Sequence, residues 1–147
     1  MTNREVTTLE DMLCFNIYAA SREITRIYRP ILSKFNITYP QYLVLVLLWE
    51  KEICTVTELG ERLYLDSATL TPLLKRLEAA NLVYRKRSAE DERRVEIGLT
   101  DKGAALKNDL KDVSISIFEK ICKTEENYFG LLDHSKDVLQ KAHDIAR

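Results

Sequence analysis

TELGERLYLDSATLTPLLKRLEAAN, residues 57–81, contains two runs of helical pattern joined by a tight turn at Leu65 and Asp66. In the second run Leu70, Leu73, Leu74 and Leu77 recur at helical spacing and must face inward. Asp66 is a good N-cap for this second helix, because its carboxylate can accept from free backbone N–H groups. The pattern predicts a helix-turn-helix, and an ordinary helical hairpin with a solvated face fits it equally well.

The outward face of the second helix combines small hydroxyl side chains near its start with cations further along. Small polar side chains let a helix approach base edges in the major groove of DNA, and Lys or Arg side chains hold phosphates. The residues that this face would offer to DNA are Ser67, Thr69, Thr71, Lys75 and Arg76.

Two segments that alternate apolar with polar or basic residues follow, at residues 82–87 and 94–99, with a polar tip between them. This period of two predicts a β-hairpin, and residues 53–56 could add a short third strand. A helix-turn-helix followed by a basic hairpin is a winged helix-turn-helix, which reads the major groove with a helix and the backbone or minor groove with the wing. The expected fold is therefore mainly α with a small β wing.

The composition places any DNA affinity in a local patch. The 147 residues carry a net charge of -1, whereas residues 75–94 hold seven Lys or Arg and four Asp or Glu. We find neither a signal peptide nor an apolar run that could span a membrane, so a cytoplasmic protein is expected. Three widely spaced cysteines indicate free thiols rather than a disulfide framework, and no ligand cluster suggests a metal or another cofactor.

The helices on either side of the DNA-reading region carry more apolar surface than that region can cover. We therefore expect a single chain over 1–147, with dimerisation helices at about 8–35 and 101–147 and a winged-helix region at about 40–100. A two-fold homodimer places two recognition helices one DNA turn apart, which suits a palindromic operator. A monomeric helical bundle is the alternative.

Two stretches carry a resemblance to a known family. DERRVEIGLT, residues 91–100, resembles the wing signature of the MarR (multiple antibiotic resistance regulator) family. LYLDSATLTPLLKRLE, residues 63–78, is similar to the recognition helix of its thiol-based branch, the organic-hydroperoxide-sensing repressors. The resemblance implies a transcriptional repressor and not an enzyme. It makes Arg93 the minor-groove side chain, positioned by Asp91. Candidates for phosphate contacts are Arg85, Lys86 and Arg87, but an alternating strand cannot point all three at DNA.

Cys14 stands in an LCF context, ahead of Tyr18, Tyr28 and the ITYPQY stretch that contains Tyr39. From the residues alone, a cysteine on an apolar helix face is usually a small core hydrophobe. The resemblance implies instead that Cys14 is the sensing thiol, oxidised to a sulfenic acid. It implies that Tyr28 and Tyr39 of the partner subunit bond this thiol and that Tyr18 lines the pocket. Cys122 is either a resolving thiol or a bystander.

The function expected from these observations is a redox-sensing DNA-binding repressor, released from its operator when organic hydroperoxides oxidise Cys14. The alternative is a MarR-type repressor released by a small phenolic or drug-like ligand, with Cys14 structural. A thiol peroxidase would share the first chemical step, but the sequence offers no further nucleophile–base pair for turnover.

Overall fold

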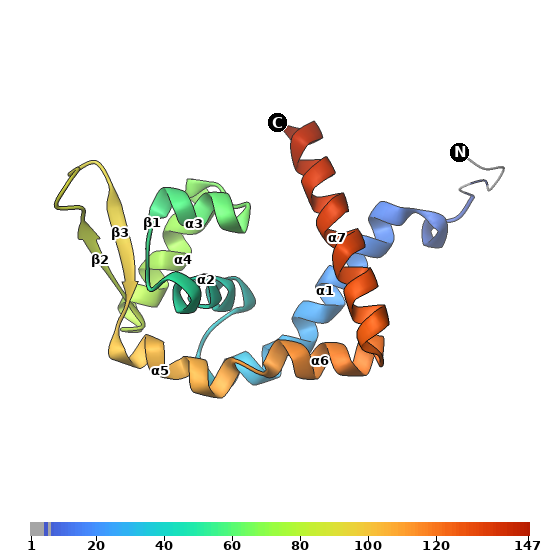
Figure 1. Ribbon diagram of the computed structural model, residues 1–147, viewed down its shortest axis with the longest axis horizontal. Helices are drawn as coiled ribbons and strands as arrows, with labels where there is room; N and C mark the ends of the chain where they lie inside the picture. The colour runs from blue at the N-terminus through green and yellow to red at the C-terminus, as the bar shows by residue number, and fades with distance from the viewer. Residues whose placement is uncertain (1–4, 6) are drawn as a thin grey trace. The chain divides into compact units, whose positions relative to one another are not determined.

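The computed structural model describes residue 5 and residues 7–147 and divides the chain into two compact units, residues 1–107 and 108–147. The first unit holds most of the helices and the sheet, and the second holds the C-terminal helices (Figure 1). The helix α5 (Asp101–Leu110) begins in the first unit and ends in the second.

The first unit opens with a 3-10 turn, and the long helix α1 begins only at Leu13, after Met12 as its N-cap residue. Pro30 lies inside α1, which continues for two residues beyond it. Thr38 and Gln41 form the expected capping box at the start of α2. The elements up to the sheet are η1 (Leu9–Asp11), α1 (Leu13–Leu32), η2 (Ser33–Phe35) and α2 (Tyr39–Lys51).

The predicted helix-turn-helix is confirmed as α3 (Val56–Leu63) and α4 (Ser67–Ala79). Thr55 caps α3 by accepting from the Glu58 N–H. Asp66 caps α4 by accepting from the Thr69 N–H over 2.7 Å. A separate side-chain cap therefore sets the residue at which each helix begins, and the turn lies between the two helices.

The wing is a three-stranded antiparallel sheet of order β1-β3-β2. Its strands are β1 (Ile53–Thr55), β2 (Val83–Arg87) and β3 (Val95–Leu99). β2 and β3 pair from Val83 opposite Leu99 to Arg87 opposite Val95, and β1 pairs with the other edge of β3. The hairpin and the third strand expected from alternation are both confirmed.

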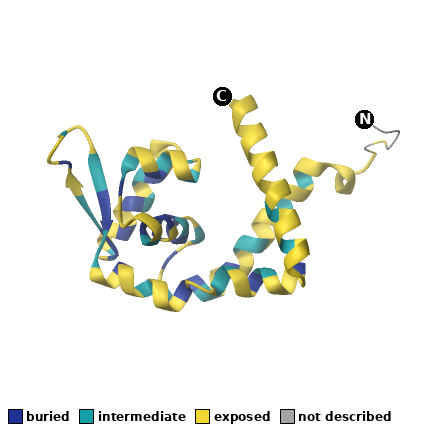
Figure 2. Cartoon of the chain, viewed as in Figure 1, coloured by how far each residue is buried: buried dark blue, intermediate teal, exposed yellow. Residues whose placement is uncertain are grey.

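The core of the first unit forms where α2, α3, α4 and β3 meet (Figure 2). Helix α2 is apolar on nearly every side, and six of its thirteen residues are buried, as a central helix requires. The fully buried side chains include Leu45, Leu48, Leu59, Leu70, Leu74, Leu77 and Ile97. Each such leucine contributes roughly 1.5–3 kcal/mol relative to leaving it exposed.

The second unit consists of the end of α5 with α6 (Val113–Cys122) and α7 (Glu125–Ala146). The recurrence of apolar residues from Leu106 to Ile121 at heptad-like spacing predicts one continuous helix from Asp101 to about Cys122. This prediction is wrong, because the helix breaks at residues 111–112. Asp112 stands at the N-cap position of α6, and its side chain makes no cap hydrogen bond there. Thr124 caps α7 through the Asn127 N–H, as expected.

No single helix among the described residues has the length and apolar character needed to cross a membrane. The pair Leu13–Phe35 and Tyr39–Lys51, which bends by 74°, meets those two requirements jointly.

The first turn of α5 packs directly against the backbone that leaves α4. A Cβ atom on Gly103 would lie 2.0 Å from the carbonyl oxygen of Leu82, so only glycine fits here without a backbone shift. A Cβ atom on Gly130, within α7, would meet no atom within 4 Å outside the backbone of its own helix. A side chain at position 103 would therefore clash with backbone, whereas one at position 130 would not.

Gly103→Ala should lower the free energy of unfolding by about 3 kcal/mol, because the added methyl group overpacks a backbone contact. Gly130→Ala is the matched control and should raise it by roughly 0.5–1 kcal/mol through lower backbone entropy in the unfolded chain. Urea unfolding followed by circular dichroism measures both. Equal effects of the two substitutions would show that the Gly103 contact does not constrain the fold.

Candidate functional site

The outward face of α4 carries the polar residues expected from the sequence. Asp66 is fully exposed, and its pKa lies below the ordinary value because the backbone N–H of Thr69 donates to the carboxylate. The cap therefore stays charged and intact at neutral pH. Exposed on this helix are Ser67, Thr69, Lys75 and Arg76, and Thr71 is half-buried.

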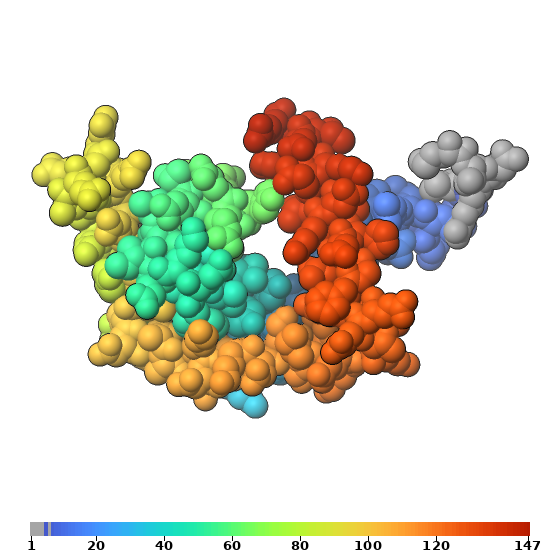
Figure 3. All heavy atoms as spheres, viewed as in Figure 1, coloured from blue at the N-terminus to red at the C-terminus, as the bar shows by residue number. Residues whose placement is uncertain are grey.

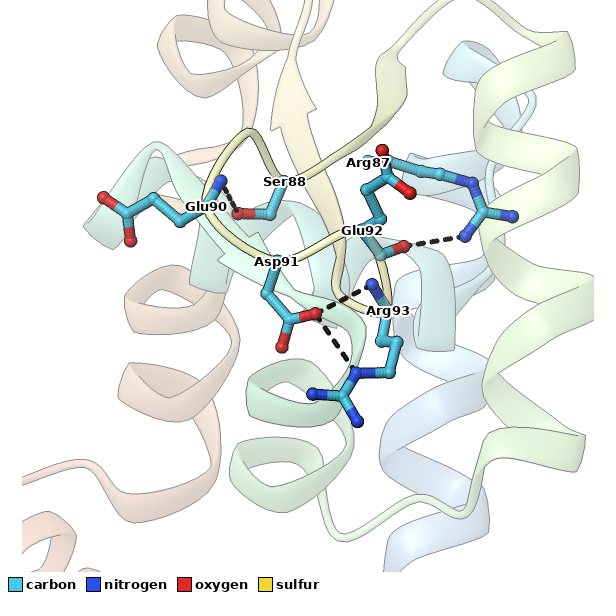
Figure 4. A network of polar contacts seen from close by, with 6 residues as sticks. All are labelled: Arg87, Ser88, Glu90, Asp91, Glu92 and Arg93. Atoms are coloured by element: carbon cyan, nitrogen blue, oxygen red, sulfur yellow. Dashed lines mark hydrogen bonds and ion pairs between the residues drawn. The ribbon is translucent and has the colours of Figure 1, made fainter.

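The tip of the wing is a closed polar turn (Figure 4). The Asp91 carboxylate accepts from the backbone N–H of Arg93 over 3.0 Å and from its Nε over 3.3 Å. Arg87 donates to the Glu92 carbonyl over 2.9 Å, and the Ser88 N–H donates to the Arg94 carbonyl. Asp91 thus orients Arg93, whose side chain is 93% exposed, as the family resemblance implied.

The cations of β2 divide between the two faces of the wing. Arg85 and Arg87 are two residues apart and share a face, whereas Lys86 points the other way and pairs with Glu96 over 3.9 Å. The prediction that an alternating strand cannot aim all three at one surface agrees with this division. In the view of Figure 3, the wing tip, drawn in yellow, stands clear of the helices of its own unit.

A cleft of about 350 Å³ lies between the start of α3 and the wing. Arg85, Arg93 and Arg94 line it from the wing, and Thr57 lines it from α3. Sequence reasoning missed Arg94 and Thr57, because strict alternation sets Arg94 opposite Arg93 and Thr57 belongs to a helix far from the wing in sequence. Three arginines and one carboxylate residue, Glu58, thus line one cleft, and this excess of cations suits the binding of phosphate oxygens.

Three tyrosines from α1 and α2 form a cluster that we call the tyrosine cluster. The ring centroids of Tyr28 and Tyr39 are 4.8 Å apart, those of Tyr28 and Tyr42 are 5.5 Å apart, and those of Tyr39 and Tyr42 are 6.0 Å apart. Tyr28 is only 2% exposed, and Tyr39 lines a mainly apolar pocket of about 490 Å³. Tyr28 and Tyr39, which the resemblance assigns to one site, lie in contact here, and Tyr42, which the sequence analysis did not single out, contacts both.

Burial raises the pKa of two of these three phenols. Desolvation, followed by the neighbouring Tyr28, raises the pKa of Tyr39. The same causes, with Tyr39 added, raise the pKa of Tyr42 to about 12. A phenol in this state is a hydrogen-bond donor in an apolar setting, which is the chemistry needed beside a reactive thiolate.

Cys14 lies in the first turn of α1, at the opposite end of this helix from Tyr28. A rise of 1.5 Å per residue separates the two by about 21 Å along the helix axis. Cys14 is exposed, and Tyr18, one turn further on, is 62% exposed with the Arg22 guanidinium over its ring. Within one chain the tyrosine cluster therefore cannot contact Cys14.

The other two cysteines are buried. Cys54 lies on β1 and is 1% exposed, and desolvation raises the pKa of its thiol, which suits a structural residue. Cys122 is the last residue of α6, in the second unit. Among the described residues, no three His, Cys, Asp or Glu side chains gather in a way that could hold a metal ion.

The fold and the basic, polar reading face place the chain in the class of winged helix-turn-helix proteins. A family model described as "Transcriptional regulator SarA/Rot" matches residues 26–110. An organic hydroperoxide resistance transcriptional regulator from Bacillus subtilis is 61% identical over 135 residues, which cover 92% of each chain.

Solved structures of similar proteins support the same class. Reduced AbfR bound to DNA is 36% identical, with a TM-score of 0.76 over 91% of this chain and 94% of that one. Overoxidised AbfR bound to DNA is 35% identical, with a TM-score of 0.75 over the same shares. AbfR comes from Staphylococcus epidermidis. The chain belongs to the MarR and SarA-type family of transcriptional regulators, in the branch of the organic hydroperoxide resistance regulator, so the resemblance noted in the sequence is confirmed.

The raised tyrosine pKa values give a test at alkaline pH. A tyrosine whose pKa is higher in the folded than in the unfolded chain costs no stability below the ordinary value of 10.0, and stability falls as the pH rises from there toward about 12. Tyr42→Phe should remove the last tyrosinate absorbance to develop and lessen this alkaline loss. Ultraviolet titration, with circular dichroism as a check on folding, measures both. Complete ionisation of the folded wild type well below pH 12 would contradict the assignment.

Proposed function

We propose that this protein is a homodimeric, redox-sensing transcriptional repressor of the cytoplasm, released from DNA when an organic hydroperoxide oxidises Cys14. One observation carries the proposal: an exposed cysteine and a cluster of protonated tyrosines lie at opposite ends of one helix. The chain in which they lie is 61% identical to an organic hydroperoxide resistance regulator. Two copies related by a two-fold axis, with antiparallel first helices, would bring each thiol to the other copy's tyrosines.

Apolar side chains outside the DNA-reading region support the dimer. Both α1 and α7 expose large apolar residues in the single chain, and α7 has no buried residue at all. Exposed apolar surface of this extent marks an interface. The exposed residues are Leu13, Ile17, Ile27, Phe129, Leu131, Val138, Leu139 and Ile145. Dimerisation through residues 8–35 and 101–147 would leave residues 40–100 free to bind a palindromic double-stranded DNA site.

On DNA, α4 would enter the major groove and offer its hydroxyl residues to base edges, with Lys75 and Arg76 on phosphates. Arg93 would enter the minor groove, held by Asp91. The remaining arginines of the wing, Arg85, Arg87 and Arg94, would bind backbone phosphates.

The sensing step would be a two-electron oxidation. The Cys14 thiolate attacks the terminal oxygen of a hydroperoxide ROOH, so that an S–O bond forms as the O–O bond breaks. Sulfur becomes a sulfenic acid, and the alkoxide that leaves takes up a proton to give the alcohol ROH. The partner subunit's Tyr28 and the partner subunit's Tyr39 would donate hydrogen bonds to the thiolate, and Tyr18 would line the pocket.

Oxidation would release DNA by removing those tyrosine bonds. On oxidation, the free-energy difference between the binding and non-binding arrangements needs to change by about 5.5 kcal/mol to reverse the populations from 99:1 to 1:99. AbfR has been solved on DNA in reduced and in overoxidised form, so the product of oxidation matters as much as oxidation itself. Cys122 would act as a resolving thiol if a disulfide with Cys14 is the releasing product.

Regulation rather than catalysis is the function that this arrangement supports. A thiol peroxidase needs an exposed intermediate and a recycling thiol at each turnover. The family is one of transcriptional regulators. Each chain would consume one hydroperoxide and then signal.

Arg93→Ala should weaken binding to the protein's own upstream DNA by about tenfold to a hundredfold, because a minor-groove contact is lost. Asp91→Ala should cost less, since Arg93 remains but loses its orientation. Arg26→Ala is the matched control, an exposed arginine paired only with Glu23 on α1. Fluorescence anisotropy measures affinity and should also give two chains per duplex. Equal losses of affinity on substitution of Arg93 and of Arg26 would show that the wing takes no specific part in DNA recognition. A stoichiometry of one chain per duplex would contradict the dimer.

A stoichiometric organic hydroperoxide, such as cumene hydroperoxide, should abolish DNA binding of wild type, and a reductant should restore it. Cys14→Ser should bind DNA and ignore the oxidant. Cys54→Ser, which alters a 1% exposed thiol, should respond as wild type does. Anisotropy and intact mass, measured on the same samples, identify the releasing product.

The outcomes separate the alternatives. Release in Cys122→Ser as in wild type would make the mechanism a single-cysteine one, whereas loss of reversible release would make Cys122 the resolving thiol. If wild type and Cys14→Ser both bind DNA and neither responds, Cys14 is structural and a small phenolic or drug-like ligand becomes the signal to seek.

A further inference from the structure

A continuous set of aromatic contacts leads from the tyrosine cluster along α2. The Tyr42 ring, which belongs to the cluster, meets the Trp49 indole edge-on, with centroids 6.2 Å apart at 68°. The two residues are seven apart on α2 and so lie on one face of the helix, two turns from each other. A displacement of Tyr28 or Tyr39 therefore reaches Trp49 through rings that already touch.

Trp49 in turn holds the start of α5. Its Nε1–H donates to the carbonyl oxygen of Gly103 over 2.9 Å, across 54 residues of sequence. The indole is half-buried, so water competes only partly for this hydrogen bond. Gly103 is also the residue whose Cα packs against the Leu82 carbonyl without room for a side chain.

The start of α5 fixes the C-terminal end of the recognition helix α4. Thr100 donates from its hydroxyl to the Asn81 carbonyl over 2.7 Å and from its backbone N–H to the Leu82 carbonyl over 3.2 Å. Lys102 Nζ donates to the Ala80 carbonyl over 3.3 Å. The Gly103 N–H donates back to the Thr100 hydroxyl, which closes the joint. The exit from α4 is therefore anchored on the same turn that Trp49 holds.

We infer that Trp49 is a positioning residue, whose hydrogen bond to Gly103 couples the tyrosine cluster to the end of the recognition helix. The inference rests on the proposed function, because it names the route by which loss of the tyrosine contacts would displace α4. In the DNA-binding arrangement the Trp49 bond sets the position of α5 and of the α4 exit. When the tyrosines move, the indole moves with Tyr42, and this bond lengthens or breaks.

A purely structural Trp49 would act differently. If the indole only fills space, its loss would weaken the folded state in both redox forms and leave the ratio of their DNA affinities unchanged. A positioning residue would change that ratio, because its contact belongs to one arrangement only. The ratio is therefore the readout that separates the two roles.

The chain has a single tryptophan, so unmodified wild type already carries its own probe. Intrinsic fluorescence should shift when a stoichiometric organic hydroperoxide is added, in step with DNA release and reversibly with a reductant. Cys14→Ser should show no shift. Unchanged emission from a wild type that has released its DNA would overturn the inference, and this test needs no substitution of Trp49.

Trp49→Phe keeps an aromatic ring against Tyr42 and removes the N–H donor. It should weaken DNA binding of the reduced protein by about three- to tenfold, the effect of losing one partly buried hydrogen bond, and leave the oxidised protein unchanged. The ratio of the two affinities should fall by the same factor. Tyr84→Phe is the matched control, because Tyr84 lines the same surface pocket as Trp49 and contributes nothing to the Gly103 bond.

Failure of the inference and failure of the proposed function give different results. If wild type keeps its DNA after oxidation, the redox function fails and there is no switch to couple. If wild type releases DNA and Trp49→Phe shows the wild-type affinity ratio, the function stands and Trp49 is a packing residue. An equal fall in the ratio for Tyr84→Phe would likewise overturn the specific role of the indole N–H.

Discussion

The packing of Gly103 against the Leu82 carbonyl is the contact on which the DNA-reading part of this protein depends. Because no side chain stands between them, α5 can start directly on the backbone that leaves α4 and enters the wing. Thr100 can then bond two successive carbonyls of that exit, and Trp49 can reach the Gly103 carbonyl from α2. Recognition helix, wing and central helix are thereby fixed by one turn of backbone. A larger residue at position 103 would loosen all three together.

The length of α1 imposes the second constraint. Twenty residues of unbroken helix hold Cys14 and Tyr28 apart by far more than a hydrogen bond can span. A thiol sensor that uses these tyrosines can therefore exist only between two chains. Sensing and dimerisation would be the same requirement, and the exposed apolar residues of α1 beside Cys14 suit both.

Local rules predicted much of this arrangement. Leucine spacing predicted the helix-turn-helix. Single residues, Thr38, Asp66 and Thr124, marked the caps of three helices. Alternation predicted the wing, with strand bounds correct to within a residue. Contacts between residues far apart in the chain could not be predicted from the sequence. The Trp49 bond spans 54 residues, and Tyr42 is one of many apolar residues in a helix that is apolar almost all round. The break before α6 depends on two residues within a pattern that otherwise continues across it.

Magnitudes indicate how such a switch could work without large stored strain. A net hydrogen bond contributes about 0.5–1.5 kcal/mol, so two tyrosine bonds at each of two thiols would supply roughly 2–6 kcal/mol per dimer. The upper end of that range meets the differential of about 5.5 kcal/mol that carries a two-state equilibrium from one side to the other. One indole bond at each α5 is too weak to make this difference by itself. The indole bond would instead transmit the change, because a shift in the tyrosine cluster moves the α4 exit only if a rigid contact joins the two. A tyrosine is protonated at physiological pH even at its ordinary pKa of 10.0, and burial raises the pKa of Tyr39 further, so oxidation of the thiol rather than ionisation of a phenol would set the state of the switch.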